Sequence, residues 1–157
     1  MKFYLPFFLF IFFSVSGSSQ TKIGGKGGVN LTFFNESQSQ FGETPKSELG
    51  YFGGLFINVP ISERFHFQPE ILYKGIGDFE FINAPIYVEY YVNNDISLLL
   101  GPSLNYFFDF FTNKFKVRGD VSAVYHFTET FQLNLKYTQG FEELSPNITF
   151  LGVGYIL

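Results

Sequence analysis

Apolar and polar residues alternate along several segments of this chain. In residues 64–74, RFHFQPEILYK, every second side chain is apolar and most of the intervening ones are polar. The same split occurs in residues 115–127, FKVRGDVSAVYHF, and in residues 131–137, FQLNLKY. Because successive side chains of a β-strand point to opposite faces, this period of two predicts strands with one apolar and one polar face. A soluble β-sandwich and a transmembrane β-barrel both satisfy the pattern.

The turns between these segments favour one of the two folds. ISERFHF from Ile61, VNNDISL from Val92 and FTETFQL from Phe127 share an apolar residue, three turn formers with an acid, and an alternating restart. This pattern predicts tight hairpins. The connections between them are mostly longer, at residues 36–47, 109–114 and 142–147, whereas residues 75–78 form a short one. Eight strands are expected, near residues 22–34, 48–59, 64–74, 79–91, 96–108, 114–126, 131–141 and 147–157.

An even number of strands, with short turns at one end and longer loops at the other, is the layout of an outer-membrane barrel. About 9–11 residues per tilted strand suffice to cross a bilayer, and every expected strand is at least that long. In lipid the strands must also close edge to edge, because no water satisfies free backbone groups. We predict an all-β fold, an eight-stranded antiparallel up-and-down transmembrane β-barrel.

Aromatic residues argue against the alternative of a soluble, lipocalin-like carrier. The chain has 24 Phe and 10 Tyr, and many of them cluster at the ends of the expected strands. Such clusters fit the aromatic girdles of a membrane barrel. A soluble carrier would instead need an apolar interior and a polar exterior.

The first residues have the three-part layout of a secretory signal peptide. Lys2 is followed by an apolar run from Phe3 to Phe13 and then by small residues up to Ser19. The run is shorter than the ~20 residues of a membrane-spanning helix. We predict a signal peptide at residues 1–19 and an outer-membrane β-barrel domain at residues 20–157. The mature protein is thus expected in the cell outer membrane.

Charge and composition exclude other classes of function. The net charge of -4 leaves no basic excess to attract nucleic acid. The chain has no Cys and only two His, His66 and His126, so no metal site is expected.

Residues 24–32, GGKGGVNLT, look at first like the phosphate-binding loop of ParA-like ATPases. Such a loop needs a Lys followed by Ser or Thr at the start of a helix. Asn30 and Leu31 stand there instead, in a segment that is rich in strand-forming residues. No nucleotide or other cofactor is expected, and the glycines are predicted to let a narrow barrel bend and to leave room inside it.

The chain resembles the small outer-membrane β-barrel family known as PorT-like or "porin family" in Gram-negative bacteria. The resemblance covers Lys22 to Leu157 and rests on KIGGKGGVNLT, GLFINVPISERFHFQPEILY, APIYVEYYVNNDISLLLGPSLNY and LGVGYIL. The resemblance allows adhesion, envelope integrity or an accessory role in protein secretion, of which the PorT comparison itself implies only the last, in contact with outer-membrane lipid and lipopolysaccharide. Family members usually end in Phe, part of the signal that the barrel assembly machinery reads, whereas this chain ends in Leu157.

The inward faces are expected to fill the lumen with a polar network rather than to line an open channel. Eight strands enclose a space just wide enough for side chains. The basic members are Lys26, Arg64, Lys74, Lys116, Arg118 and Lys136, and the acidic members are Glu70, Glu89 and Asp120. Arg118 is expected to pair with one of these three acids. A narrow pore for small solutes is the alternative.

No catalytic residues are expected, because no nucleophile, base and orienting acid converge by spacing. Some eight-stranded barrels modify lipid A with His and Ser near the outer rim, and such an enzyme is the other alternative. Both histidines here fall near the short turns, at the opposite rim. We predict a monomer that acts through its surface loops or an envelope protein partner. Two interpretations remain for Phe41, Phe110 and Phe111 on the loop side: an ordinary aromatic girdle beside a flexible loop, or a docking patch for a partner.

Overall fold

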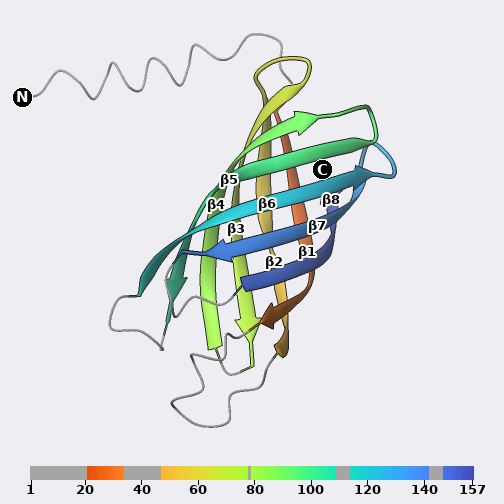
Figure 1. The fold of residues 1–157 in the computed structure, drawn as a ribbon. Coiled ribbons are helices and arrows are strands. Elements are labelled where there is room, and N and C mark those ends of the chain that lie inside the picture. The colour runs from red at the N-terminus through yellow and green to blue at the C-terminus, as the bar shows by residue number, and fades with distance from the viewer. Residues whose placement is uncertain (1–20, 34–46, 78, 109–113, 142–146) are drawn as a thin grey trace, which may run out of the picture.

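The computed structural model describes residues 21–33, 47–77, 79–108, 114–141 and 147–157. Eight strands form one closed antiparallel barrel in sequence order, which confirms the predicted fold (Figure 1). Their bounds lie within two residues of those expected from the sequence. The strands are β1 (Lys22–Phe33), β2 (Ser47–Pro60), β3 (Phe65–Ile76), β4 (Phe79–Tyr91), β5 (Ile96–Phe107), β6 (Phe115–His126), β7 (Phe131–Gly140) and β8 (Asn147–Ile156).

The barrel closes by pairing its first strand with its last. β1 and β8 pair from Gly24 opposite Ile156 to Phe33 opposite Asn147. The other side of β1 pairs with β2 along its whole length. Every strand therefore has two neighbours, and no sheet edge is left with unpaired backbone groups.

The three short turns have the same structure, as the repeated sequence pattern predicts. In each, the amide of the first turn residue donates to the carbonyl that opens the next strand, at 2.8 Å for Ile61, 2.9 Å for Val92 and 3.0 Å for Phe127. The second turn residue, Ser62, Asn93 or Thr128, accepts a hydrogen bond from the amide of that same strand residue. These local bonds set the register of each hairpin. We call this end of the barrel the short-turn end and the other the loop end.

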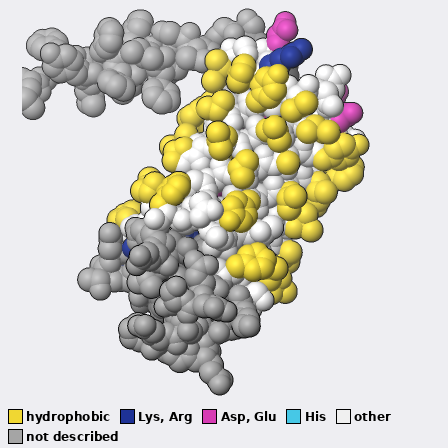
Figure 2. Space-filling view, viewed as in Figure 1, with side chains coloured by type: hydrophobic (Ala, Val, Ile, Leu, Met, Phe, Trp, Pro, Cys, Tyr) yellow, Lys and Arg dark blue, Asp and Glu magenta, His cyan; other side chains and the backbone are white. Residues whose placement is uncertain are grey.

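Polarity is inverted relative to a soluble protein. Among the described residues, buried side chains comprise 18 polar or charged residues and 11 hydrophobic ones. The outward positions of the eight strands are almost entirely apolar, and Glu80, at the loop end of β4, is the one charged residue among them. Figure 2 shows one side of the barrel, where hydrophobic side chains cover the wall.

Some expectations lie outside the described residues. They are the signal peptide at residues 1–19 and the docking patch of Phe41, Phe110 and Phe111. No helix within the described ranges is long and apolar enough to span a bilayer.

Candidate functional site

Polar side chains at the short-turn end form the first of three layers inside the barrel. We call Asn58, His66, Gln68, Glu89, Ser97 and His126 the mouth network. The Glu89 carboxylate lies at its centre, almost fully buried, and accepts hydrogen bonds from Asn58 Nδ2 and Ser97 Oγ. Asn58 Nδ2 also donates to Gln68 Oε1 at 2.9 Å. Both histidines stand at the rim of this layer, with the Tyr91 ring between theirs, 4.6 Å from His66 and 5.3 Å from His126.

Ser97, His126 and Glu89 are the residue types of a hydrolytic triad. Their hydrogen bonds, however, do not have the donors and acceptors that such a triad needs. Ser97 Oγ donates its only hydrogen to Glu89 Oε1 at 2.5 Å. His126 Nε2, 3.0 Å from Ser97 Oγ, must therefore act as the donor of that second bond. A nucleophilic serine needs the reverse, a histidine that accepts its proton. Ser97 is also fully buried, so this arrangement stabilises a carboxylate rather than activating a nucleophile.

The middle layer contains an ion pair between β1 and β3, which are separated by β2. The Lys26 ammonium on β1 contacts Glu70 Oε1 on β3, and both side chains are buried. Gln68 Nε2 donates to the same oxygen at 2.8 Å. Because Gln68 also accepts from Asn58, the ion pair is continuous with the mouth network.

Asp120 on β6 is the second acidic centre of the middle layer. Its Oδ1 accepts from Thr138 at 2.8 Å and from Ser103 at 3.0 Å. Its Oδ2 accepts from Tyr87 Oη at 2.8 Å and from Lys136 Nζ at 3.3 Å. Four donors from three strands thus hold one buried carboxylate, which is the arrangement that makes a buried charge tolerable.

The Lys74 side chain lies against an aromatic ring. Its ammonium lies 3.9 Å from the centre of the Phe150 ring, and that of Lys136 lies 4.6 Å from the same ring. A cation held against an aromatic face gains electrostatic energy, more so when water is excluded. Phe150 therefore joins the polar middle layer to the apolar layer next to it.

Apolar side chains form the third layer, at the loop end. We call Phe52, Leu72, Ile76, Phe81, Phe107, Ile148 and Phe150 the apolar cap. The rings of Phe81 and Phe107 stack 4.5 Å apart, and Phe52 meets Phe150 edge to face at 5.5 Å. Each of these side chains is at most 7% exposed. The cap therefore closes the lumen on the loop side of the charged middle layer.

The structure places most of the predicted lumen residues inside the barrel. Lys26 with Glu70 and Lys136 with Asp120 are brought together as ion pairs, while Glu89 lies in the mouth network. Arg118 is buried near the loop end, with its guanidinium 5.6 Å from the Phe107 ring, and Lys116 is half-buried one step closer to the loops.

Arg64 is the exception. It lies exposed in the turn before β3, which starts at Phe65. The alternation of inward and outward side chains does not extend into a turn. The prediction that Arg64 faces the lumen is therefore wrong.

Several residues of the site were not identified by the sequence analysis. Asn58, Ser97 and Tyr87 are neutral, and their importance comes from the buried carboxylates that they contact. Only the packing across the barrel shows which acid each one contacts. Within the described ranges, no group of three potential ligand side chains could hold a metal ion.

Comparisons with known proteins agree with this architecture. No family model matches the chain, and no curated protein does. Among solved structures, a de novo designed transmembrane β-barrel superposes with a TM-score of 0.59 at 15% identity, over 87% of this chain and 95% of that one. The fold is that of a small outer-membrane β-barrel.

Two natural proteins share this fold. Ail, the attachment invasion locus protein of Yersinia pestis, solved with the heparin analogue sucrose octasulfate, superposes with a TM-score of 0.55 at 13% identity, over 90% of this chain and 100% of that one. Neisserial surface protein A gives 0.57 at 13% identity, over 90% and 99% of the two chains.

Proposed function

We propose that this protein is a monomeric integral barrel of the outer membrane of a Gram-negative bacterium, exported by residues 1–19 and folded from residues 20–157. The observation that carries the proposal is the apolar wall of the barrel, whose outward strand positions include a single charge, Glu80. A soluble protein exposes mixed polar surfaces, whereas lipid-facing strands expose apolar ones. Lipid and lipopolysaccharide are then its immediate surroundings.

The spacing of outward aromatic residues supports this location. On β6, Phe115 and Tyr125 both point outward and are ten residues apart. At about 3.3 Å per residue, ~33 Å of strand separates them. With a tilt of roughly 40°, this distance becomes ~25 Å along the barrel axis, the height of the apolar band of an outer-membrane barrel. The two residues would therefore mark the two interfaces of the bilayer.

The interior supports a closed barrel without catalytic activity. The apolar cap fills the lumen at the loop end, and the buried ion pairs fill the middle. Ser97 is held as a hydrogen-bond donor to Glu89, so the most suggestive cluster of reactive residue types is structural. A filled lumen leaves the loops and the rims as the working surfaces.

We therefore assign the function to attachment at the cell surface through the loops. Two proteins that share the fold support this assignment: the name of Ail favours attachment, and the name of Neisserial surface protein A favours the cell surface. The PorT-like sequence resemblance suggests a different partner, an envelope protein of a secretion machine. In either case the loop-side docking patch of Phe41, Phe110 and Phe111 would make the contact, and the barrel assembly machinery would insert the chain.

Fractionation and gel mobility test the location. The protein should co-sediment with outer membranes and migrate differently in gels before and after boiling, because a closed barrel resists detergent until heated. Recovery in the soluble fraction without detergent would contradict the membrane location. In planar bilayers, the wild type should give no steady large currents, and such currents would contradict the closed lumen.

A further inference from the structure

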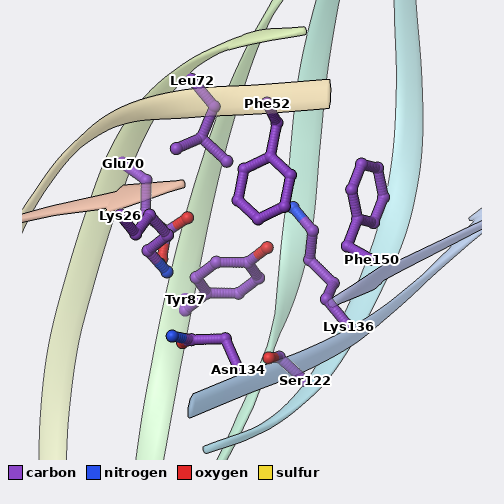
Figure 3. A pocket seen from close by; sticks show the side chains of 9 residues that line it. All are labelled: Lys26, Phe52, Glu70, Leu72, Tyr87, Ser122, Asn134, Lys136 and Phe150. Carbon is purple, nitrogen blue, oxygen red and sulfur yellow. The ribbon is translucent and has the colours of Figure 1, made fainter. Parts of the chain in front are cut away.

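A small internal cavity lies between the two acidic centres of the middle layer. Its volume is about 10 Å³, close to the least in which one water molecule fits. Figure 3 shows the side chains around it, with Tyr87 near the centre and Glu70 and Lys26 on one side. The lining residues are Lys26, Phe52, Glu70, Leu72, Tyr87, Ser122, Asn134, Lys136 and Phe150.

Buried polar atoms at this cavity have no hydrogen-bond partner within the described residues. They are Oε2 of Glu70 and both amide atoms of Asn134, Oδ1 and Nδ2. Glu70 is 6% exposed and Asn134 is 5% exposed, so bulk solvent does not reach them freely. Leaving one such group unsatisfied costs about 1–3 kcal/mol. Three such atoms at one cavity therefore indicate a bound polar species.

The mixture of these atoms indicates which species binds. Glu70 Oε2 and Asn134 Oδ1 require a donor, whereas Asn134 Nδ2 requires an acceptor. A cation would satisfy the oxygens, but the ammonium groups of Lys26 and Lys136 line the same cavity and would repel it. An anion would satisfy the amide nitrogen, but it would meet the Glu70 carboxylate. Water both donates and accepts, carries no charge and fits the volume.

We propose that this cavity is a specific site for one ordered water molecule, which donates to Glu70 and to Asn134 and joins the Lys26–Glu70 pair to the region of Asn134 and Lys136. The water completes a hydrogen-bonded path that starts at His126 and runs through Ser97, Glu89, Asn58 and Gln68 to Glu70. The apolar cap covers the cavity on its loop side, where Phe52, Leu72 and Phe150 are shared between the cap and the lining. Exchange with solvent therefore runs through the short-turn end. The inference concerns the interior alone and does not depend on the proposed attachment function.

Nuclear magnetic resonance of the refolded full chain in lipid nanodiscs tests the site. Water-selective cross-relaxation spectra should show a contact between a long-lived water and the side-chain amide protons of Asn134. Because Ser122 also lines the cavity, its backbone amide should show a second contact in the wild type. Asn134→Leu should abolish that contact, because leucine fills the space and removes two of the three polar atoms. Ser103→Ala is the matched control, since it removes a buried lumen hydroxyl that does not line the cavity, and its water contacts should match those of the wild type.

Two results would overturn the site. One is a folded wild type whose Asn134 amide shows no contact with water. The other is Asn134→Leu with the Ser122 contact unchanged, which would place the water elsewhere. The wild-type spectrum decides the matter by itself if the leucine variant does not fold.

Discussion

The Lys26 ammonium on β1 and the Glu70 carboxylate on β3 form a buried ion pair across the face of the intervening strand β2. Gly54 stands on β2 directly opposite Lys26. Since glycine has no side chain, the long Lys26 side chain can cross the inner face of β2 at this level. The glycine-rich first strand and its partner thus make room for a charge network, which is the role that the glycines were predicted to have.

Removing one member of this pair should destabilise the barrel strongly. Glu70→Gln keeps an acceptor for Gln68 but leaves the Lys26 ammonium buried without a carboxylate. We expect the free energy of unfolding, measured by urea titration in phospholipid vesicles, to fall by about 3–5 kcal/mol. Adding Lys26→Met removes the stranded charge and should restore most of the loss. Glu63→Gln, in an exposed turn, should change stability by less than about 0.5 kcal/mol. Equal losses in the single and double variants would show that the pair is not the cause.

Two adjacent glycines of β2 should respond oppositely to alanine. A Cβ on inward Gly54 would lie 2.0 Å from the Ile71 carbonyl oxygen, whereas one on outward Gly53 would come no closer than 3.9 Å to its nearest heavy atom, Lys26 O. Gly54→Ala should therefore lower the free energy of unfolding by about 1–3 kcal/mol through overpacking. Gly53→Ala should leave it unchanged or raise it by about 0.4–1 kcal/mol, because alanine restricts the unfolded chain. The same titration measures both, and a destabilised Gly53→Ala with a neutral Gly54→Ala would contradict the assignment of the two faces.

The fold could be predicted from this sequence because both of its signals are local. Alternation along residues 115–126 follows from the pleat of one strand, and the three short turns repeat one set of neighbouring hydrogen bonds. Neither depends on distant contacts. Prediction failed at Arg64 for the same reason: alternation has no meaning in a turn, and the turn begins at Ile61.

The pairing inside the barrel could not be predicted. The sequence did not indicate that Lys26 contacts Glu70, that Lys136 contacts Asp120, or that Asn58 and Ser97 donate to Glu89. Which side chains meet across the lumen depends on the stagger of all eight strands, and the local pattern leaves that stagger free. Neutral donors such as Tyr87 were missed because nothing nearby in the sequence marks them.

A charge on the barrel wall distinguishes a membrane protein from a soluble one. Leu100 on β5 is 67% exposed, and Ile61 in a short turn is 68% exposed. In water, arginine would be tolerated equally at both positions. In a bilayer, Leu100→Arg should cost about 2–4 kcal/mol, because the residue lies midway along the wall, whereas Ile61→Arg near the interface should cost about 0–1 kcal/mol. Refolding into phospholipid vesicles followed by urea titration measures the difference, and equal tolerance of the two substitutions would argue against the membrane location.

The attachment function predicts that binding and folding can be separated at the loop end. Deleting residues 38–46 and replacing Phe110 and Phe111 by Ser removes polar loop and aromatic groups that the proposed docking patch needs. The variant should keep its heat-dependent gel mobility, because the sequences of strands β1 to β8 are unchanged. It should lose binding to the glycan or envelope protein that the wild type retains, measured with nanodisc-embedded protein on a glycan array and by co-purification.

The opposite rim supplies the control for this prediction. Phe127 is 59% exposed in a short turn, so Phe127→Ser removes a comparable aromatic side chain from the short-turn end. Binding should survive this change, because the short turns lie at the opposite end of the barrel from the end where β1 and β5 finish and β2 and β6 begin (Figure 1). If the loop variant binds like the wild type and Phe127→Ser does not, the working surface is the short-turn end. A periplasmic partner would then replace attachment at the cell surface as the function to pursue.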